Sequence, residues 1–141
     1  LALIDTGSHI HAADVDVHFP DYVGHVRESS AQRRGATATT AGGHQLSNRG
    51  KFTVSAIAGG HQVKIPFNNM QVQLPILSVR EMMDKESSVL IEDDTGIISN
   101  KRTQQSINFI VRDGLWFMKL KVRKPDGSPA ENESGFGRPG P

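Results

Sequence analysis

The tripeptide Asp-Thr-Gly occurs twice in this chain, over residues 5–7 and again over residues 94–96. An aspartate at the end of a buried strand can act as a general acid or base, because its neighbours exclude water and fix its rotamer. Two such carboxylates about 3 Å apart cannot both ionise readily, so they share one proton and titrate as a pair. The ionised carboxylate can take a proton from water while the protonated one polarises a carbonyl group. The repeat therefore raises the hypothesis of hydrolysis by paired aspartates.

The first copy stands in surroundings that suit a reactive aspartate. Leu1–Ile4 is a short apolar run, typical of a buried strand, and Asp5 follows it directly. Thr6 offers a hydroxyl group for a structural hydrogen bond, and Gly7 lets the backbone turn tightly beside the carboxylate. We therefore predict that Asp5 lies at the end of a buried strand and is the catalytic candidate.

The second copy has the composition of a turn. Glu92 and Asp93 precede Asp94, and such a run of acids is not buried together because each unpaired buried charge is costly. The stretch "EDDTG" between two apolar runs is typical of a hairpin turn, for which Asp and Gly supply the backbone geometry. We therefore predict that Asp94 lies on an exposed turn.

The partner of Asp5 must then come from elsewhere. One chain of 141 residues is too short to hold two full lobes, each with its own catalytic aspartate. The economical source of the second carboxylate is Asp5 of another copy, related by a twofold axis. The sequence therefore favours a homodimer as the catalytic unit.

The composition limits the class of protein. The net charge of +1 makes neither nucleic acid nor an acidic membrane surface an expected partner. Cysteine is absent, which excludes disulfides, a thiol nucleophile and a Cys-based zinc site, and is compatible with a reducing compartment. No apolar run approaches the roughly 18 residues of a membrane span. The chain begins inside an apolar run without Met, which we interpret as a fragment edge rather than a signal peptide.

Most of the chain has the pattern of strands. Apolar residues alternate over 52–56 and over 63–67, and Gly59-Gly60 between them predicts a β-hairpin. Two further hairpins are predicted, with turns at residues 93–96 and at Asp113-Gly114. Residues 27–50 are small and polar, and a loop of that length inside a domain is usually functional or disordered.

One segment has the spacing of a helix. Ile76, Val79 and Met83 recur at helical intervals, and Ser78 is in position to cap the N-terminus of the helix. We expect the side chains of Met82 and Met83 to face the core.

Several stretches together resemble the retropepsins. The stretch "LIDTGS" resembles their active-site strand, and "TAGGHQLSNRGKFTV" resembles their flap, the glycine-bearing hairpin that closes over substrate. The stretch "IAGGHQVKIPFNNMQVQLPILSVREMMDKE" resembles the strands after the flap and the closing helix. Two stretches, "LPILSVREMMDKESSVLIEDDTGIIS" and "RDGLWFMKLKV", are similar to the segment of copia-type retrotransposon polyproteins that leads from the protease toward integrase. The resemblance covers about Leu1–Val122.

The resemblance implies a fold and a division of the chain. The fold would be all-β, a retropepsin-like closed barrel of the six-stranded type with one short helix and additional C-terminal hairpins. Residues 1–86 would form the protease core, and residues 87–122 would form C-terminal β-hairpins that continue toward the pre-integrase segment. In residues 123–141 Pro and Gly dominate and no apolar period survives, so this segment would be a disordered linker or tail.

The resemblance also implies roles for individual residues. Asp5 would be the catalytic acid and base. The active-site loop would comprise the next three residues, Thr6, Gly7 and Ser8, with Thr6 binding across the dimer axis. Gly42 and Gly43 would lie near the tip of the substrate-binding flap, and Ile76 and Leu77 would pack beneath the catalytic loop.

The chain departs from the pattern of the family at three places. Copia-type elements usually read Asp-Ser-Gly-Ala, whereas Thr6 and Ser8 occupy the second and fourth positions here. Retropepsins use terminal strands for dimer contacts, and the strand that would precede Leu1 is missing. The family's glycine before the helix is Ser78 here, a change that copia-type members share. The first departure is mild, and the second concerns the dimer.

We therefore expect an aspartic endopeptidase of a retrotransposon polyprotein that acts as a homodimer. Its substrate would be an extended peptide bound as an added strand under the flap, with the polyprotein itself as the natural target. We expect no cofactor, no membrane association and no nucleic-acid binding by this domain. The expected location is cytoplasmic, which includes intracellular retrotransposon particles. The alternative is a truncated or decayed, non-catalytic β-domain of a retroelement polyprotein that only packs or binds.

A second alternative concerns the histidines after the motif. On a strand, His9 and His11 would face the same way and could bind a metal ion. Structural zinc sites usually recruit cysteine or a tighter set of histidines, so we expect a polar surface segment and no metal.

Overall fold

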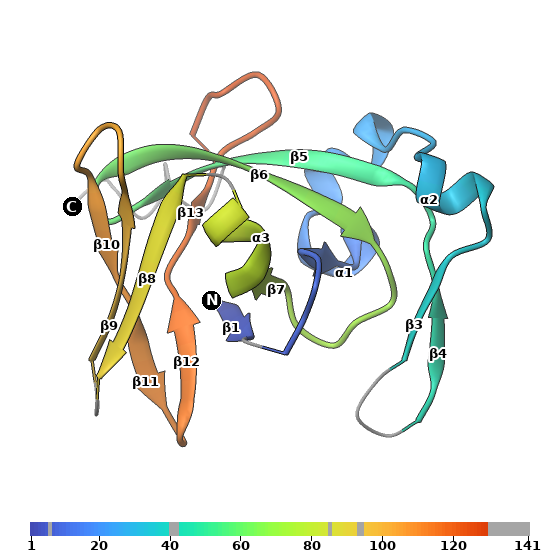
Figure 1. The fold of residues 1–141 in the computed structure, drawn as a ribbon. Coiled ribbons are helices and arrows are strands. Elements are labelled where there is room, and N and C mark those ends of the chain that lie inside the picture. Colours follow the sequence, from blue (N-terminus) through green and yellow to red (C-terminus); the bar gives the residue numbers. More distant parts are fainter. Residues whose placement is uncertain (6, 40–42, 85, 93–94, 130–141) are drawn as a thin grey trace.

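A computed structural model describes residues 1–5, 7–39, 43–84, 86–92 and 95–129 (Figure 1). This part of the chain is mostly strands, 49% in all, with few short helices, which agrees with the prediction of an all-β protein. Thr6, Gly42 and Asp94 lie outside the described residues, as do residues 130–141 of the predicted tail. The roles predicted for Thr6 and Gly42, and the exposed turn predicted for Asp94, therefore remain predictions.

Eight strands form the main sheet. Their spatial order is β11 (Ile110–Arg112), β12 (Leu115–Met118), β1 (Ala2–Asp5), β7 (Ile76–Ser78), β2 (Ala12–Ala13), β6 (His61–Asn69), β5 (Lys51–Ala58) and β13 (Lys121–Val122). A three-stranded sheet has the order β10 (Ser106–Asn108), β9 (Thr95–Asn100) and β8 (Ser87–Glu92). The hairpin of β3 (Thr37–Thr39) and β4 (Gln45–Ser47) forms a two-stranded sheet of its own.

The expected closed barrel is not found among the described residues. The main sheet ends at β11 on one side and at β13 on the other, and these two strands are not hydrogen-bonded neighbours. The architecture that the structure describes is therefore a strongly curved open sheet (Figure 1). The hairpin β3–β4 projects beyond the end of the strands β5 and β6.

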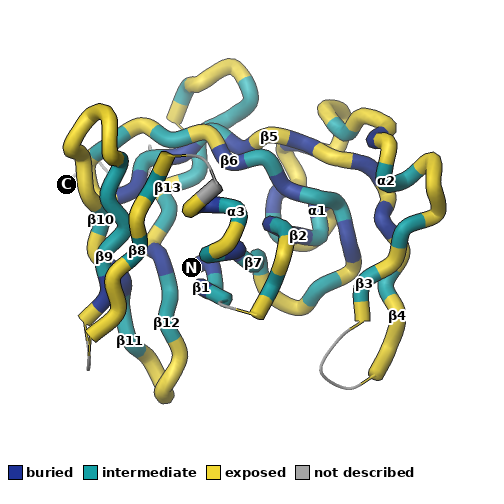
Figure 2. Tube along the Cα trace, in the orientation of Figure 1, coloured by how far each residue is buried: buried dark blue, intermediate teal, exposed yellow. Residues whose placement is uncertain are grey.

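The hairpin β5–β6 forms as the alternating pattern predicts. Ala58 pairs with His61 across the turn, and Gly59 and Gly60 have φ angles of 57° and 81°. Both values lie in the left-handed region that a tight two-residue hairpin requires and that glycine adopts without strain. Alternate residues of β5 are buried, as Figure 2 shows along this strand, so one face of the hairpin supplies the core.

Aromatic rings fill the core beneath this hairpin. The ring of Phe67 on β6 lies 5.8 Å from that of Phe52 on β5 and 5.3 Å from that of Phe19. Tyr22 is 2% exposed and packs edge-on against Phe19. Aromatic packing therefore holds the segment that carries Phe19 and Tyr22 against the hairpin β5–β6.

In the part of the chain that the structure describes, four short helices accompany the sheets. They are α1 (Val15–His18), the 3-10 helix η1 (Pro20–His25), α2 (Ser30–Arg33) and α3 (Val79–Asp84). The sequence predicted α3 from the spacing of its apolar residues and from Ser78, but it did not predict the other three, whose residues lack apolar side chains at helical spacing. Two of these begin at polar caps: Asp14 accepts a hydrogen bond from the N–H of Asp16, and Ser29 accepts one from the N–H of Gln32.

The predicted C-terminal hairpins contribute to two sheets. The strands β8, β9 and β10 form the separate three-stranded sheet, whereas β11 and β12 belong to the main sheet. The strands β10 and β11 are separated only by Phe109, whose N–H donates to the carbonyl oxygen of Gly96. The hairpin β11–β12 turns at Asp113 and Gly114, as predicted, with φ angles of 51° and 77°. Since β12 pairs with β1, residues from both sides of the predicted boundary at residue 86 contribute to the main sheet.

The first residues of the predicted tail are ordered. The N–H of Gly127 donates to the carbonyl oxygen of Lys124, which closes a turn, and Arg123 pairs with Pro129 in an isolated bridge. The hydroxyl group of Tyr22 donates to the carbonyl oxygen of Arg123 at 2.6 Å. This anchors the start of the segment to the core. None of the helices in the described ranges is long and apolar enough to cross a membrane.

Candidate active site

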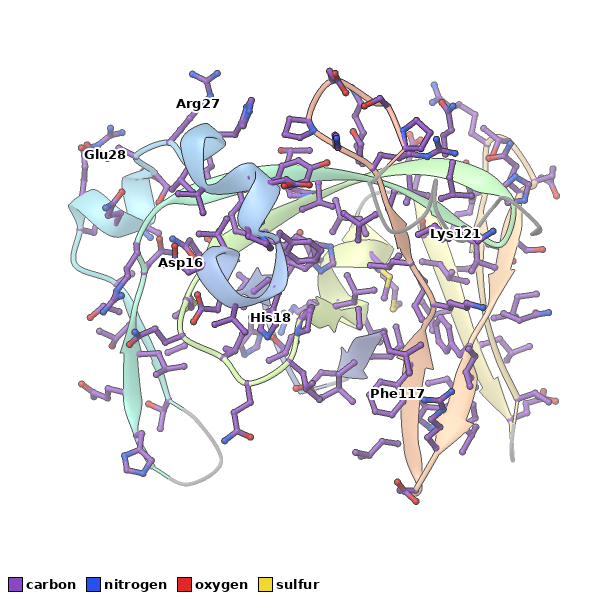
Figure 3. All side chains as sticks on the ribbon, turned by 180° about the vertical axis from the view of Figure 1, so that it is seen from behind. Asp16, His18, Arg27, Glu28, Phe117 and Lys121 are labelled. Atoms are coloured by element: carbon purple, nitrogen blue, oxygen red, sulfur yellow. The ribbon has the colours of Figure 1, made fainter. Side chains whose placement is uncertain are left out.

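Asp5 is the last residue of β1, as predicted. Its strand lies between two others, with β12 antiparallel on one side and β7 parallel on the other. Ala2 and Ile4 are buried, whereas Leu3 and Asp5 are partly exposed. Phe117, which pairs with Leu3, is labelled on β12 in Figure 3 and marks the side of the molecule where β1 is paired. Glu28, which precedes α2, lies on the opposite side. The aspartate is therefore fixed at the end of an interior strand and reaches solvent.

The carboxylate is held by the turn that follows it. The N–H of Gly7 donates to Oδ1 of Asp5 at 2.8 Å, which closes a turn between a side chain and its own backbone. A Cβ atom at Gly7 would lie 3.4 Å from this oxygen. This distance is an ordinary van der Waals contact, so a side chain at position 7 would touch the carboxylate.

Ser8 is used within the loop. Its hydroxyl group donates to the carbonyl oxygen of Ile10 at 2.7 Å. Its own carbonyl oxygen accepts a hydrogen bond from Oγ of Ser78, also at 2.7 Å. The loop after Asp5 is therefore tied to the junction between β7 and α3, some 70 residues away in the sequence.

Ser78 organises that junction. It pairs with Asp5 in the parallel register of β1 and β7, and it is fully buried. Its Oγ accepts a hydrogen bond from the N–H of Glu81 at 3.1 Å, which confirms the predicted N-cap of α3. Ile76 and Leu77 lie beside Leu3 and Ile4 in the same register, so they pack against the strand that carries Asp5.

The helix α3 presents one methionine to the core and the other to solvent. Met82 is 9% exposed, as expected, but Met83 is 53% exposed. The expectation for Met83 is wrong because neighbouring helical residues point about 100° apart, so only one of the two can face the sheet.

A buried histidine was not anticipated. His11 is 5% exposed, and its Nδ1 accepts a hydrogen bond from the N–H of Ser78 at 2.9 Å. Its Nε2 lies 3.0 Å from Oε2 of Glu81, whose other oxygen accepts a hydrogen bond from the backbone N–H of His11. Ser78 and Glu81 have the Ser-x-x-Glu spacing of a capping box, and this spacing was the signal in the sequence that pointed to Glu81. In a capping box the side chain of the glutamate accepts a hydrogen bond directly from the backbone N–H of the cap residue. Here the imidazole ring stands between them.

The histidines do not form a metal site. The side chain of His9 is exposed, and its Nδ1 lies 3.2 Å from a guanidinium nitrogen of Arg80. His11 is engaged by Ser78 and Glu81 instead. Over the ranges that the structure describes, no group of three or more His, Cys, Asp or Glu side chains could hold a metal ion.

The predicted flap region contains a hairpin. Thr37 pairs with Ser47 and Thr39 with Gln45, and none of the residues of β3 or β4 is buried. Gly43, in the connection between the strands, has a φ angle of 85° and open space where a Cβ would lie. The hairpin is separate from the main sheet, as the prediction of a flap requires.

The base of this hairpin, in contrast, is buried. Asn48 is 8% exposed, and its Oδ1 accepts hydrogen bonds from the N–H of Gly50 at 2.9 Å and the hydroxyl group of Ser29 at 3.3 Å. Its amide nitrogen donates to Oδ1 of Asn68 on β6. These contacts attach the hairpin to the end of the β5–β6 pair.

A cavity of about 300 Å³ lies behind the junction, between β6, α3 and the three-stranded sheet. Its walls include Ile65, Leu77 and Met82, and the side chains of His11 and Glu81 also border it. Asp5 is not among the residues that line this cavity.

Comparison with protein-family models, with curated proteins and with solved structures finds no match for this chain. The assignment of function therefore rests on the geometry around Asp5 and on the resemblance of its motifs.

Proposed function

We propose that this chain is a retropepsin-like aspartic endopeptidase of a retrotransposon polyprotein, active as a homodimer. The observation that carries the proposal is the position of Asp5. It ends an interior strand, is partly exposed, and has one carboxylate oxygen held by the N–H of Gly7. A carboxylate that is fixed but reachable is what general acid–base chemistry requires.

The proposed catalytic unit pairs Asp5 of one copy with Asp5 of another. At close approach the two carboxylates share one proton, so the pair has one ionised and one protonated member. The ionised member removes a proton from water as its oxygen attacks the scissile carbonyl carbon. The protonated member donates a hydrogen bond to the carbonyl oxygen, on which negative charge develops. Breakage of the C–N bond then releases an amine and a carboxylic acid.

The separate hairpin β3–β4 suits the proposed role of a flap. An extended peptide can bind as an added strand, because its main-chain groups then satisfy hydrogen bonds along their whole length. The hairpin has exposed polar residues and its own two-stranded ladder, so it can move against the main sheet without exposing core residues. The natural substrate of the enzyme would be the parent polyprotein inside the cell.

The proposal is tested by cleavage of the parent polyprotein and of a library of extended peptides, followed by mass spectrometry. Asp5→Asn is expected to abolish cleavage, because an amide cannot accept the proton of the attacking water. Asp94→Asn, which removes the aspartate of the second motif, is expected to leave the rate nearly unchanged. Activity per chain is expected to fall on dilution, since the monomer holds one catalytic aspartate.

Two outcomes would overturn the proposal. Cleavage that survives Asp5→Asn would exclude Asp5 as the reactive group. Absence of cleavage from all substrates, at concentrations where sedimentation shows a dimer, would favour the alternative of a non-catalytic β-domain that only packs or binds.

A further inference from the structure

A side chain of β7 ties the loop that follows Asp5 to the sheet. Oγ of Ser78 donates to the carbonyl oxygen of Ser8, and the same residue pairs with Asp5 in the parallel register. Any displacement of Ser78 therefore moves both the end of β1 and the loop beyond it.

The backbone of Ser78 is held in turn by His11. The N–H of Ser78 can only donate, so Nδ1 of His11, 2.9 Å away, must carry its lone pair. The ring proton of a neutral imidazole then resides on Nε2, which points at the carboxylate of Glu81 at 3.0 Å. The contacts of the ring thus select one tautomer, because a proton on Nδ1 would face the N–H of Ser78.

Glu81 completes the arrangement from α3. One of its carboxylate oxygens meets Nε2 of His11, and the other accepts a hydrogen bond from the backbone N–H of His11. Its own N–H is bound by Oγ of Ser78. The three residues therefore form a closed unit that connects the segment after the active-site loop, β7 and the first turn of α3.

We infer that His11 and Glu81 are positioning residues that hold the Asp5 loop through Ser78, and that protonation of His11 at Nδ1 releases it. A positively charged imidazole presents an N–H on both sides, so it cannot accept the hydrogen bond from Ser78. The inference about protonation concerns the loop itself, whereas its effect on catalysis rests on the proposed function.

Charged and titratable groups stand near His11 on two elements. The carboxylate of Glu81 on α3 lies against the ring and favours a positive imidazole, and Lys64 and His61 on β6 border the same cavity as His11. The strand β7 and the strand β2, which begins next to His11, contain no titratable side chain. Arg80 on α3 lies against His9 instead. The N–H of Ser78 is therefore the contact that discriminates against a proton on Nδ1.

The first measurement is the protonation state of each histidine nitrogen by ¹⁵N NMR, in the wild-type protein and in Asp5→Asn. At neutral pH we expect Nδ1 of His11 to be unprotonated and Nε2 protonated. On acidification, protonation of His11 should coincide with shifts of the Ser8 and Ser78 amide signals in both proteins. A proton on Nδ1 at neutral pH, or protonation that leaves these amides unchanged, would overturn the inference whether or not the protein is a protease.

The second measurement compares two substitutions that cannot titrate. His11→Asn keeps an acceptor near the position of Nδ1, whereas His11→Gln keeps a donor near the position of Nε2. We expect kcat to fall roughly 10- to 100-fold in His11→Gln with little change in KM, because a small displacement of a reacting group has effects of this size. His11→Asn should retain more activity than His11→Gln does. On acidification it should lose a smaller share of its activity than the wild type loses.

The matched control is His9→Gln, because His9 is exposed and lies two residues away on the same loop. It should leave kcat and the acidic side of the pH profile unchanged. Equal losses in His11→Asn and His11→Gln, with an unaltered pH profile, would show that the ring is needed only for packing and would contradict the positioning role.

Discussion

The segment that carries Asp5 and the hairpin β3–β4 are held in different ways. Asp5 ends a strand with a neighbour on each side, and the loop beyond it is bonded to a serine some 70 residues away. The two strands of the hairpin pair with each other over three residue pairs, and none of their residues is buried. Among the described residues, hydrogen bonds between the hairpin and β6 are made at its base, by Asn48 and Arg49. Buried contacts therefore hold β1 along its length, whereas they hold the hairpin at its base.

The difference follows from composition. The strands β1 and β7 supply apolar side chains to the core, and a buried serine satisfies the polar groups at their ends. The hairpin strands consist of Thr, Ala, Gln and Ser, apart from Leu46, which is only partly buried. A segment with few buried apolar contacts opens at low free-energy cost, which is the usual property of elements that close over a ligand.

The largest effect is expected where the hairpin joins the sheet. Gly50 has a φ angle of 106°, and a Cβ there would lie 2.6 Å from the carbonyl oxygen of Arg27. Gly50→Ala should therefore lower the free energy of unfolding by about 3 kcal/mol or more, through backbone strain and overlap together. Gly43→Ala, where φ is also positive but the space is open, should cost about 1 kcal/mol. Urea unfolding measures both, and equal losses would show that the base is no more constrained than the connection.

A smaller effect is expected at the junction itself. Ser78→Ala removes the cap of α3 and leaves the carbonyl oxygen of Ser8 without its donor, so it should cost about 1–3 kcal/mol. Ser47→Ala, at an exposed position of β4, should change the free energy of unfolding by less than about 0.5 kcal/mol. Thermal and urea unfolding of the two variants make the comparison. A larger loss in Ser47→Ala would reverse the assignment of the anchored region.

The hydrogen bonds of the Tyr22 hydroxyl group, which tie residue 123 to the core, depend on pH. The hydroxyl group of Tyr22 donates to the carbonyl oxygen of Arg123 and accepts a hydrogen bond from the N–H of Ser55, and burial raises the pKa of the phenol above its usual value of 10.0. Since the folded state disfavours the phenolate, this stabilisation is complete below pH 10 and is lost as the pH rises further.

Tyr22→Phe should accordingly cost about 1–2 kcal/mol at neutral pH, because two partly buried backbone groups lose a partner. Above pH 10 its stability should fall less steeply than that of the wild type, since the group that titrates is gone. Urea unfolding from pH 7 to 11 tests this, and parallel curves for the two proteins would argue against a buried neutral phenol.

Hydrogen exchange compares the stability of the two regions without any substitution. Amides of residues 37–39 and 45–47 should exchange much faster than those of Val54 and Ile65, since the latter lie in the buried β5–β6 ladder. A bound peptide inhibitor should slow the exchange of the hairpin selectively. Protection of the hairpin equal to that of β5–β6 in the free protein would contradict its independence.

Local patterns predicted much of this fold. The alternation around Gly59-Gly60, the turn at Asp113-Gly114 and the cap at Ser78 each depend on neighbours in the sequence, and each forms as predicted. The position of Asp5 at a strand end followed from the apolar run before it.

Contacts between distant residues could not be predicted. Nothing in the sequence places β1 between β7 and β12, because the order of strands depends on packing of the whole chain. The pairing of His11 with Glu81, and the open rather than closed main sheet among the described residues, are of the same kind. The short helices before residue 34 escaped prediction because capping residues alone do not distinguish a helix from a turn.

The claim that two copies of Asp5 form one active site can be tested by mixing. Wild-type and Asp5→Asn chains are combined at a constant total concentration, well above that needed for dimerisation, and the initial rate of cleavage is measured at each ratio. Because a mixed dimer contains only one Asp5, the rate should follow the square of the wild-type fraction, and an equal mixture should retain about a quarter of the activity. A linear decrease, with about half of the activity left in the equal mixture, would show that each chain acts alone and would contradict the shared active site.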